Sequence, residues 1–414
     1  MSFEWYTEFI DLDYKPQDEL ICVFKVDPDG ISMDEAAGRV ASESSVGTWT
    51  TLAKLPDRIK RLMARVYEMD GNTIKVSYPL DLFEEGNIPQ LLSSVAGNVF
   101  GMRALKNLRL EDILFPPEYS KHFKGPHLGI EGAQKVFNES RPLTATVPKP
   151  KVGFDADEYS QVAYQAWTGG IDFVKDDENL TSQPFIKFED RLEKVMKVRD
   201  KVEEETGEKK VFLVNITAET AKMEERAKKV ADYGNEYIMI DVVTAGWSAV
   251  QTIREVCEDL NLGIHAHRAM HAAFTRNPLH GISLNVLVKL SRLVGVDNFH
   301  VGTGVGKMYG AAEEVLHLAD ICRGSWGDLK KVFPVSSGGL HPGLVPAVID
   351  LFGNDVIVQA GGGVHGHPGG TFEGARALRQ SIEAAMNGED LREAAERHSE
   401  LSRALEKWEY VSPK

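Results

Sequence analysis

A run of charged residues directly after a short apolar stretch is the segment best suited to chemistry. The apolar residues 171–174 lead into Lys175, Asp176, Asp177 and Glu178. Because side chains alternate along a strand, Lys175 and Asp177 are predicted to lie on one face and Asp176 on the other. Glu178 lies where the strand would end and can turn back toward that pair. The segment therefore brings two carboxylates and one amine together at the end of a strand.

This set of side chains fits a metal site only if the lysine is modified. A protonated lysine has no lone pair to give to a metal ion. If the Lys175 amine reacts with CO₂, the resulting carbamate carries an oxygen anion, and together with Asp177 and Glu178 it offers three hard oxygen ligands that suit Mg²⁺. The alternative interpretation is a solvated charge run. The apolar strand directly before the charges favours the metal site, because (β/α) enzymes keep their chemistry at the ends of strands.

Basic, histidine and glycine residues follow the other short apolar stretches of the chain. If the chain forms a barrel, these residues are predicted to surround one site at the C-terminal ends of its strands. Glycine-rich loops after the last two strands often bind phosphate through backbone N–H groups. The pattern places two anion sites on one rim, with Arg268 and His300 at one site and Lys307 at the other. Two such sites predict a substrate that carries two phosphate groups. His265 alone is interpreted as a core histidine. The candidates are Lys149, Lys151, His267, Arg268, His300, Lys307, Ser337, Gly338, Gly339, Gly361 and Gly362.

The elements that must position these residues alternate regularly from about residue 140. Short apolar strands are each followed by a helix-period segment, most clearly at 188–202, with Gly207 past its end. Such a succession of eight βα units is what a (β/α)₈ barrel requires. A doubly wound sheet is the alternative, but no nucleotide-binding glycine pattern opens the first helix. We therefore predict an α/β fold with a (β/α)₈ TIM barrel at 126–414. Its strands are expected at 144–147, 171–175, 211–215, 237–241, 263–267, 298–301, 332–335 and 356–359.

Residues 1–125 are predicted to form a smaller α+β domain. Strand and helix patterns follow one another in the order βαββαβ, which suggests a ferredoxin-like sandwich. Pro116-Pro117 and Gly125-Pro126 mark the boundary. Strands are expected at 20–26, 63–69, 73–78 and 108–114, with a hairpin turn at Asp70-Gly71, and helices at 33–42 and 88–100.

Composition and charge narrow the function classes. The chain has 414 residues, of which 43% are hydrophobic and 26% charged, as in a soluble two-domain protein. A net charge of −15 disfavours nucleic acid or anionic lipid as partners. No apolar run is long enough for a membrane span, and an acidic N-terminal segment argues against a signal peptide. The widely spaced Cys22, Cys257 and Cys322 fit free buried thiols in a reducing cytoplasm, where we expect the protein.

The segment 169–185 resembles the metal-site signature of ribulose-1,5-bisphosphate carboxylase/oxygenase (RuBisCO) large subunits, and seven further segments between residues 41 and 370 are similar to that family as well. The resemblance implies that Lys175 is the carbamylated (N6-carboxylysine) ligand of Mg²⁺, beside Asp177 and Glu178. It implies that Lys149 moves a proton near C2 of the substrate. Lys151 and His267 are implied to face the substrate. One phosphate site is implied for Arg268, His300 and Ser337. The other phosphate site is implied for Gly339, Gly361 and Gly362, together with Lys307.

The same resemblance extends to the N-terminal domain and to assembly. Glu43, Thr48, Trp49 and Asn98 match residues that the family supplies from a neighbouring subunit. A dimer is therefore implied as the smallest active unit, alone or in an oligomer of dimers, and a small subunit is not expected.

The activity implied is carboxylation of ribulose 1,5-bisphosphate. A base removes a proton beside the substrate carbonyl, Mg²⁺ stabilises the enediolate, and the enediolate attacks CO₂ while Lys307 stabilises the new carboxylate. Hydration and cleavage then yield two molecules of 3-phosphoglycerate, which makes the protein a carbon–carbon lyase. O₂ can attack the same enediolate, so a monooxygenase reaction is expected alongside. The compact chain resembles archaeal form III members, which implies a role in AMP degradation.

Three departures and two alternatives accompany this interpretation. Lys307 and Ser337 are only thirty positions apart, Tyr309 stands where many members have Glu, and the chain ends at Lys414 without the tail of plant enzymes. These departures affect how a lid over the site is held closed more than the reaction class. The first alternative is a RuBisCO-like enolase/isomerase that acts on a methylthio sugar phosphate without fixing CO₂. The second is a non-catalytic sugar-phosphate-binding subunit.

Overall fold

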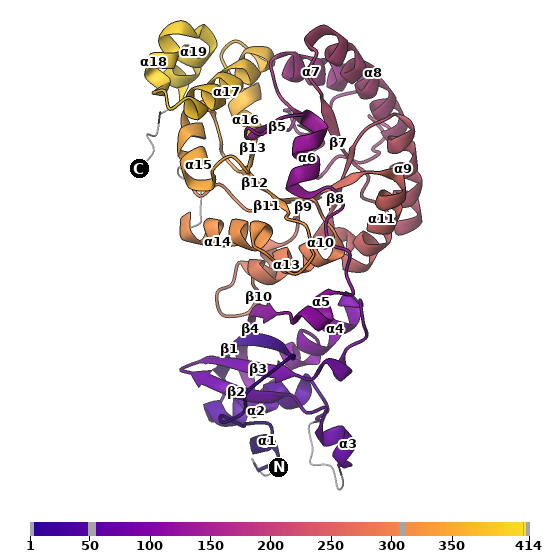
Figure 1. Ribbon diagram of the computed structural model, residues 1–414, viewed down its shortest axis with the longest axis vertical. Helices are drawn as coiled ribbons and strands as arrows, with labels where there is room; N and C mark the ends of the chain where they lie inside the picture. The colour runs from indigo at the N-terminus through magenta and orange to yellow at the C-terminus, as the bar shows by residue number, and fades with distance from the viewer. Residues whose placement is uncertain (1–3, 49–54, 306–311, 409, 411–414) are drawn as a thin grey trace. The chain divides into compact units, whose positions relative to one another are not determined.

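The chain divides into two compact units, each of which is described by itself. In the computed structural model of the protein, residues 4–48, 55–305, 312–408 and 410 are described. The first unit contains residues 1–124 together with 270–293, and the second contains residues 125–269 and 294–414. Figure 1 labels their helices and strands. The sequence pattern had not indicated that the segment 270–293 groups with the N-terminal residues.

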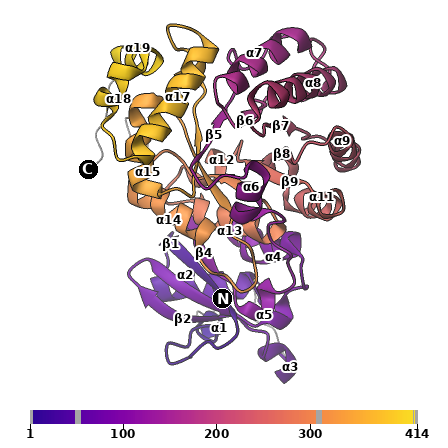
Figure 2. The same cartoon turned by 45° about the horizontal axis from the view of Figure 1, so that its top comes forward.

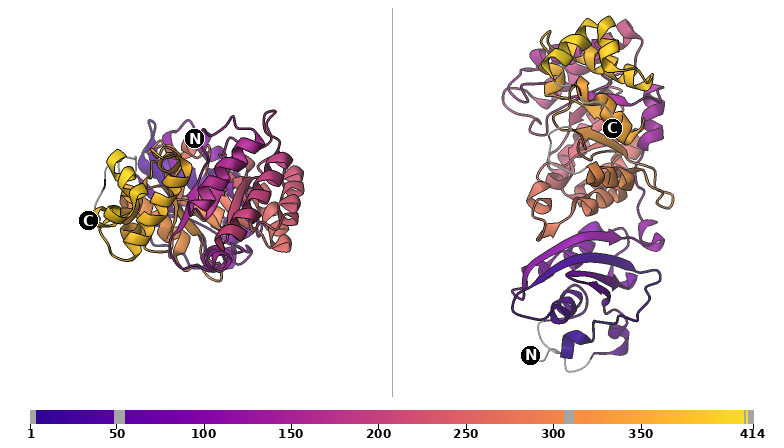
Figure 3. Two further views of the ribbon diagram at one scale, coloured as in Figure 1. Left: turned by 90° about the horizontal axis from the view of Figure 1, so that it is seen from above. Right: turned by 90° about the vertical axis from the view of Figure 1, so that its left-hand side faces the viewer.

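The first unit is built on a five-stranded sheet of order β10-β4-β1-β3-β2. Neighbours among the first four strands of the chain are antiparallel, whereas β10 pairs parallel to β4. Helix α2 follows β1 and α4 follows β3, so the order βαββαβ and the ferredoxin-like arrangement are confirmed. The right-hand view of Figure 3 shows the sheet of this unit with helical segments beside it. The strands are β1 (Leu20–Pro28), β2 (Arg65–Asp70), β3 (Thr73–Tyr78), β4 (Leu105–Leu114) and β10 (Gly281–Ile282). The helices are α1 (Glu4–Thr7), α2 (Met33–Glu43), α3 (Asp57–Lys60), η1 (Leu80–Leu82), α4 (Ile88–Val95), η2 (Asn98–Gly101), α5 (Pro117–Ser120), α12 (Ala272–Thr275) and α13 (Leu284–Val294).

The predicted helix 88–100 is wrong in its second half. Helix α4 ends at Val95, and a separate 3₁₀ turn, η2, begins at Asn98. Between them the backbone folds back so tightly that a Cβ on Gly97 would lie 2.1 Å from the Ser93 carbonyl oxygen. Glycine, which is a poor helix former, is needed for this close approach. The break moves Asn98 out of the helix and onto a turn.

The second unit is a closed barrel of eight parallel strands, as predicted, in the order β11-β12-β13-β5-β6-β7-β8-β9. Strands β5, β7 and β8 are buried at every position, because barrel strands are covered by side chains inside and by helices outside. In Figure 2, helices α7, α8, α9 and α11 follow one another around the strands. The strands are β5 (Leu143–Thr146), β6 (Phe173–Lys175), β7 (Val211–Asn215), β8 (Tyr237–Asp241), β9 (Gly263–His267), β11 (Asn298–His300), β12 (Phe333–Ser337) and β13 (Ile357–Gln359).

The helices of this unit begin and end with recognisable signals. Asp155 and Glu158 form a capping box at the start of α7, and Gly207, with φ of 69°, ends α8 in the left-handed conformation. The helices are α6 (Gly129–Phe137), α7 (Ala156–Thr168), α8 (Phe188–Thr206), α9 (Thr220–Asp232), α10 (Val242–Ala245), α11 (Trp247–Leu260), α14 (Ala312–Arg323), η3 (Pro342–Leu344), α15 (Val345–Phe352), α16 (Gly362–His365), α17 (Thr371–Met386), α18 (Leu391–Arg397) and α19 (Ser399–Lys407).

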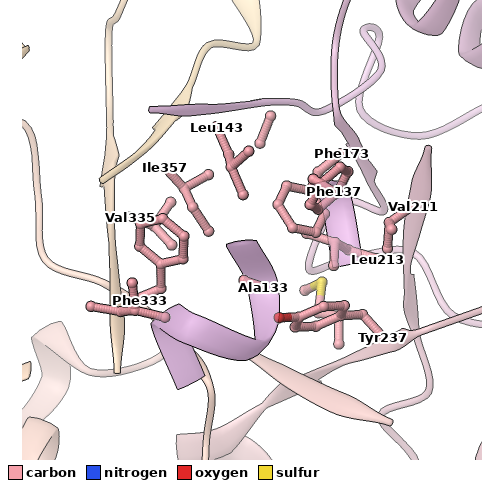
Figure 4. Close-up of a cluster of buried hydrophobic side chains, with 13 residues drawn as sticks. Ala133, Phe137, Leu143, Phe173, Val211, Leu213, Tyr237, Phe333, Val335 and Ile357 are labelled. Carbon is pink, nitrogen blue, oxygen red and sulfur yellow. The ribbon is translucent and has the colours of Figure 1, made fainter. Parts of the chain in front are cut away.

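One end of the barrel is filled by helix α6. Its Ile130, Ala133 and Phe137 pack against apolar side chains from the barrel strands in one buried cluster (Figure 4). The rings of Phe137 and Phe173 meet edge to face, with centroids 4.8 Å apart. Since Phe173 begins β6, this packing fixes the start of the strand whose other end carries Lys175. The polar groups are left at the C-terminal ends of the strands.

Candidate active site

Lys175 is the last residue of β6 and is fully buried. Its Nζ atom donates a hydrogen bond to the backbone oxygen of Asp176 at 2.8 Å. Burial lowers the pKa of Lys175 below its usual value, and the carboxylates of Glu178, Asp241 and Asp177 oppose this effect. Burial therefore favours the neutral amine, the form of lysine that is nucleophilic.

The Asp176 carboxylate points away from this side of the strand, as alternation predicts. It accepts hydrogen bonds from the Tyr159 hydroxyl at 2.8 Å, from Arg191 Nη2 at 3.0 Å and from the Asn215 backbone N–H at 2.8 Å. Arg191 also donates to the Thr181 backbone oxygen at 2.8 Å. Both members of the Asp176–Arg191 ion pair are fully buried. This network ties the loop after β6 to helices α7 and α8 and to strand β7.

Asp177 meets Lys149 across the top of the barrel. The distance from Lys149 Nζ to Asp177 Oδ2 is 3.1 Å. Asn179 donates to Asp177 Oδ1 from its side chain at 2.9 Å and from its backbone at 3.2 Å. Burial raises the pKa of Asp177, but the hydrogen bonds from Asn179 and Lys149 outweigh this effect and hold it below its usual value. Asp177 is therefore an ionised carboxylate with a lysine beside it.

His267 lies between two carboxylates. Its Nδ1 atom is 3.1 Å from Asp241 Oδ1, and its Nε2 atom is 3.6 Å from Glu178 Oε2. Asp241, the last residue of β8, was not among the predicted site residues. Its place at the end of a barrel strand is the signal that could have identified it.

Further buried histidines at the ends of the next strands are linked by hydrogen bonds. His300 Nδ1 lies 2.8 Å from the Ser337 hydroxyl, and His300 Nε2 lies 2.9 Å from His265 Nε2. Burial, followed by the neighbouring histidines and cations, holds the pKa of His300 well below its usual value, so the ring is neutral. Burial lowers the pKa of Arg268 to about 10, which leaves it charged at neutral pH. A Cβ on Gly302 would lie 3.9 Å from Arg268 Nη2, which places the guanidinium beside the end of β11.

A cavity of about 620 Å³ collects many of the predicted residues of the barrel. Gly361 lies against the lysine side chain, since a Cβ there would be 3.2 Å from Lys149 Cε, whereas a Cβ on Gly362 would meet nothing within 4 Å. Gly363 lies against the Leu340 carbonyl oxygen, where a Cβ would stand 2.1 Å away. The backbone at Gly362 is therefore open to an approaching group. Predicted residues lining this cavity are Lys149, Lys151, Asp177, Glu178, Gly338, Gly339, Gly361 and Gly362.

The remaining predicted residues lie elsewhere. Glu43, Thr48 and Asn98 line a separate cavity of about 720 Å³ within the first unit, together with Arg39 and Arg103. Trp49 and Lys307 lie outside the described residues. Within the described ranges, no three His, Cys, Asp or Glu side chains form a group that could hold a metal ion, and no helix is both long and apolar enough to cross a membrane.

His365 of α16 links the glycine loop to β5. Its Nε2 atom is 3.0 Å from the Thr146 hydroxyl and its Nδ1 atom is 3.0 Å from the Thr371 hydroxyl. Thr146 also donates to the Ala360 backbone oxygen at 2.6 Å. Burial, with a contribution from Lys149, lowers the pKa of His365 to about 4.

This shift predicts a pH-dependent contribution to stability. Between pH 6.5 and about 4 the unfolded chain binds a proton at His365 and the folded protein does not, so the free energy of unfolding falls as the pH falls through this window. In His365→Gln, the loss of stability between pH 7 and pH 5 should be smaller than in the wild type by about 2 kcal/mol. Urea unfolding at the two pH values measures this difference. Equal losses in both proteins would contradict the prediction.

The chain matches known proteins over both units. Residues 129–408 match the family described as the ribulose bisphosphate carboxylase large chain, catalytic domain, and residues 8–119 match its N-terminal domain. The ribulose bisphosphate carboxylase of Pyrococcus furiosus is 56% identical to this chain over 420 residues, and the alignment covers 100% of both chains. The ribulose bisphosphate carboxylase of Archaeoglobus fulgidus is 48% identical over 438 residues, and the alignment covers 100% of this chain and 99% of the relative.

Solved structures agree with the sequence relatives. The octameric Rubisco from Pyrococcus horikoshii, in complex with sulfate ion, superimposes with a TM-score of 0.95 at 56% identity, covering 97% of this chain and 96% of that one. The dimeric archaeal Rubisco from Hyperthermus butylicus superimposes with a TM-score of 0.93 at 51% identity, covering 99% and 100%. With this closed barrel and both domains matched, the chain is an enzyme that belongs to the ribulose bisphosphate carboxylase (RuBisCO) large-chain family.

Proposed function

We propose that the protein carboxylates ribulose 1,5-bisphosphate to give two molecules of 3-phosphoglycerate, and that it also oxygenates the same substrate. The observation that carries this proposal is the cavity at the C-terminal ends of the barrel strands. It combines Lys149, Lys151, Asp177 and Glu178 with two glycine loops, next to the buried Lys175. The names and identities of the relatives support the same reaction.

The donor set at the end of β6 fits Mg²⁺ if Lys175 carries a carbamate. Asp177 and Glu178 supply two oxygen ligands, and the neutral Lys175 amine can add to CO₂, forming an N–C bond and releasing one proton. The resulting anion completes a set of three hard oxygen ligands. When bound there, Mg²⁺ supplies positive charge that stabilises negative charge developing on substrate oxygens. Asp241 and Glu178, on either side of His267, orient its ring toward the same region.

Two groups of residues suit the two phosphoryl groups of the substrate. Arg268, His300 and Ser337 would hold one of them, with the neutral His300 ring fixed by its hydrogen bond to Ser337. Gly339, Gly361 and Gly362 would hold the other through backbone N–H groups, since glycine permits close approach of an anion. Lys307 is proposed to join the second group and to stabilise the carboxylate formed from CO₂. The sulfate ion named for the P. horikoshii structure supports anion binding in this family.

Lys149 is proposed as the residue that moves a proton near C2. Its amine is held 3.1 Å from Asp177, beside the proposed metal ligands, and Lys151 lines the same cavity. A positioned acid or base of this kind contributes typically 10²–10⁴-fold to a proton transfer.

We also propose that two chains share each active site. Glu43, Thr48 and Asn98, with Trp49, would face the barrel of a neighbouring subunit. The dimeric and octameric relatives support an assembly of dimers. We further propose a role in AMP degradation in the cytoplasm, with substrate drawn from nucleotides, on the resemblance of the compact chain to archaeal form III members.

One assay tests the reaction. The purified protein is incubated with ribulose bisphosphate, Mg²⁺ and ¹⁴C-labelled bicarbonate, and acid-stable label in 3-phosphoglycerate is the expected result. Enolisation of a methylthio sugar phosphate without incorporation of label would indicate the isomerase instead. Binding of ribulose bisphosphate without turnover would indicate a non-catalytic subunit.

A further inference from the structure

A lysine near the end of the described chain lies at the glycine-loop part of the cavity. Lys407 and Trp408, at the C-terminal end of helix α19, line the same cavity as Gly361, Gly362 and Lys149. Sequence reasoning had not singled out either residue, because a lysine near the end of a chain has no distinguishing pattern. In Figure 1 this helix lies beside α17, the helix that follows α16 in the chain.

The end of α19 is held in place by packing. Its Leu401 and Ala404 are buried in a cluster with apolar residues of α17 and α18. Trp408 stacks on the His341 ring with a centroid distance of 5.6 Å and an interplanar angle of 19°. His341 itself lines the cavity and follows the loop of Gly338 and Gly339. The stack therefore attaches the helix end to one of the two glycine loops.

Lys407 is attached to the other glycine loop. Its Nζ atom donates a hydrogen bond to the Gly366 backbone oxygen at 2.5 Å and lies 5.4 Å from the centroid of the Trp408 ring. An ammonium group has three donors, and a carbonyl oxygen does not neutralise its charge. Gly366 follows the short segment that begins with Gly362, the position whose Cβ direction is open. The ammonium is thus fixed beside the backbone that an anion can approach.

The charges of the cavity favour an additional cation at this place. Asp177 and Glu178 bring negative charge into the cavity, and Lys149 is already in contact with Asp177. A phosphoryl group carries about −1.5 to −2 charges at neutral pH. A lysine in the last turn of a helix also interacts favourably with the helix dipole. The helix dipole alone does not explain why the Lys407 amine contacts the Gly366 oxygen, because Gly366 belongs to a different part of the fold.

We propose that Lys407 is a phosphate-binding residue of the glycine-loop subsite, and that the Trp408–His341 stack holds it there. The identity of the bound molecule, ribulose bisphosphate, rests on the proposed function. The contact itself involves one phosphoryl group and one ammonium, so inorganic phosphate serves as a probe that does not depend on turnover.

Two substitutions separate charge from structure. Lys407→Gln keeps an N–H donor for the Gly366 oxygen and a side chain of similar helix propensity, but it removes the charge. We expect the KM for ribulose bisphosphate and the inhibition constant of inorganic phosphate each to rise roughly ten- to hundredfold, as loss of a hydrogen bond to a charged group predicts, with kcat nearly unchanged. Lys407→Arg keeps the charge, so its KM and its phosphate inhibition constant should both stay near the wild-type values.

The matched control is Lys228→Gln. Lys228 lies on the exposed face of α9, where it pairs with Glu224 of the same helix at 2.7 Å. Its replacement should leave the KM and the phosphate inhibition constant unchanged. Wild-type constants in Lys407→Gln would overturn the proposal, whereas a wild-type protein that does not carboxylate would overturn only the proposed function.

A second measurement needs no variant. Inorganic phosphate should protect Lys407 of the wild-type protein from an amine-acylating reagent, with Lys228 as the unprotected reference in the same digest. Mass spectrometry quantifies both sites. Equal acylation of Lys407 with and without phosphate would overturn the proposal even if the substituted protein failed to fold.

Discussion

Replacement of Lys175 by methionine is expected to abolish carboxylation of ribulose bisphosphate, with kcat falling by at least about 10³-fold. Methionine is unbranched and fills similar space, but it has no amine with which CO₂ can form a carbamate. Asp177 and Glu178 would then remain as two carboxylates without the third oxygen ligand. The assay with labelled bicarbonate measures the loss of activity. A second readout is the ¹³C NMR signal of a carbamate, which should appear in the wild type with ¹³CO₂ and Mg²⁺ and be missing in Lys175→Met.

Lys210 provides the matched control for this experiment. Lys210 is also a fully buried lysine, but it comes directly before the first residue of β7, whereas Lys175 is the last residue of β6. Its Nζ atom donates hydrogen bonds to the Ile171 backbone oxygen at 3.0 Å and to Glu208 at 2.7 Å. Lys210→Met should lower stability and leave kcat nearly unchanged. Carboxylation that persists in Lys175→Met, or a carbamate signal that persists there, would contradict the assignment of Lys175.

Replacement of Arg191 by methionine is expected to lower the free energy of unfolding by about 3–5 kcal/mol, the usual cost of leaving a buried charge without its partner. Burial raises the pKa of Asp176, and the Arg191 guanidinium opposes this effect. Without Arg191 the buried carboxylate keeps only its contacts with Tyr159 and the Asn215 backbone. Denaturant titration followed by fluorescence measures the change. The double variant Arg191→Met with Asp176→Asn should recover much of the loss, because it removes the unpaired charge.

The same substitution should weaken metal binding. Arg191 also anchors the Thr181 backbone oxygen, and Asn215 Nδ2 donates to the Glu178 backbone oxygen at 3.3 Å, so the network holds the loop that carries the proposed ligands. Activation by Mg²⁺ should therefore require a higher concentration in Arg191→Met. The exposed pair Lys228–Glu224 is the control for stability, since its removal should cost less than about 1 kcal/mol. An equally small cost in Arg191→Met would show that the buried pair does not stabilise the loop.

Much of the barrel was predictable because its signals are local. Strands β7, β8 and β9 have the predicted bounds. The first two are continuous apolar stretches ended by a polar residue, and β9 alternates apolar residues with His265 and His267. The remaining barrel strands begin and end within two residues of their predicted positions. By contrast, β10 pairs only two residues, which is too short for a pattern, and its partner β4 lies far away in the chain. The tight turn at Gly97 was equally hidden, because the approach of its backbone to Ser93 is a tertiary detail of one loop.

The sequence by itself determined the chemical character of this protein: an amine and two carboxylates at the end of one strand, histidines and an arginine after others, and two glycine loops. These residues are adjacent to apolar stretches, and strand alternation makes their direction readable. Only the tertiary structure decided which distant groups meet. Asp241 reaches His267 because β8 and β9 pair, Arg191 of α8 neutralises Asp176, and Lys407 of α19 lies against Gly366. Such contacts depend on the packing of whole helices and strands, and no spacing along the chain encodes them.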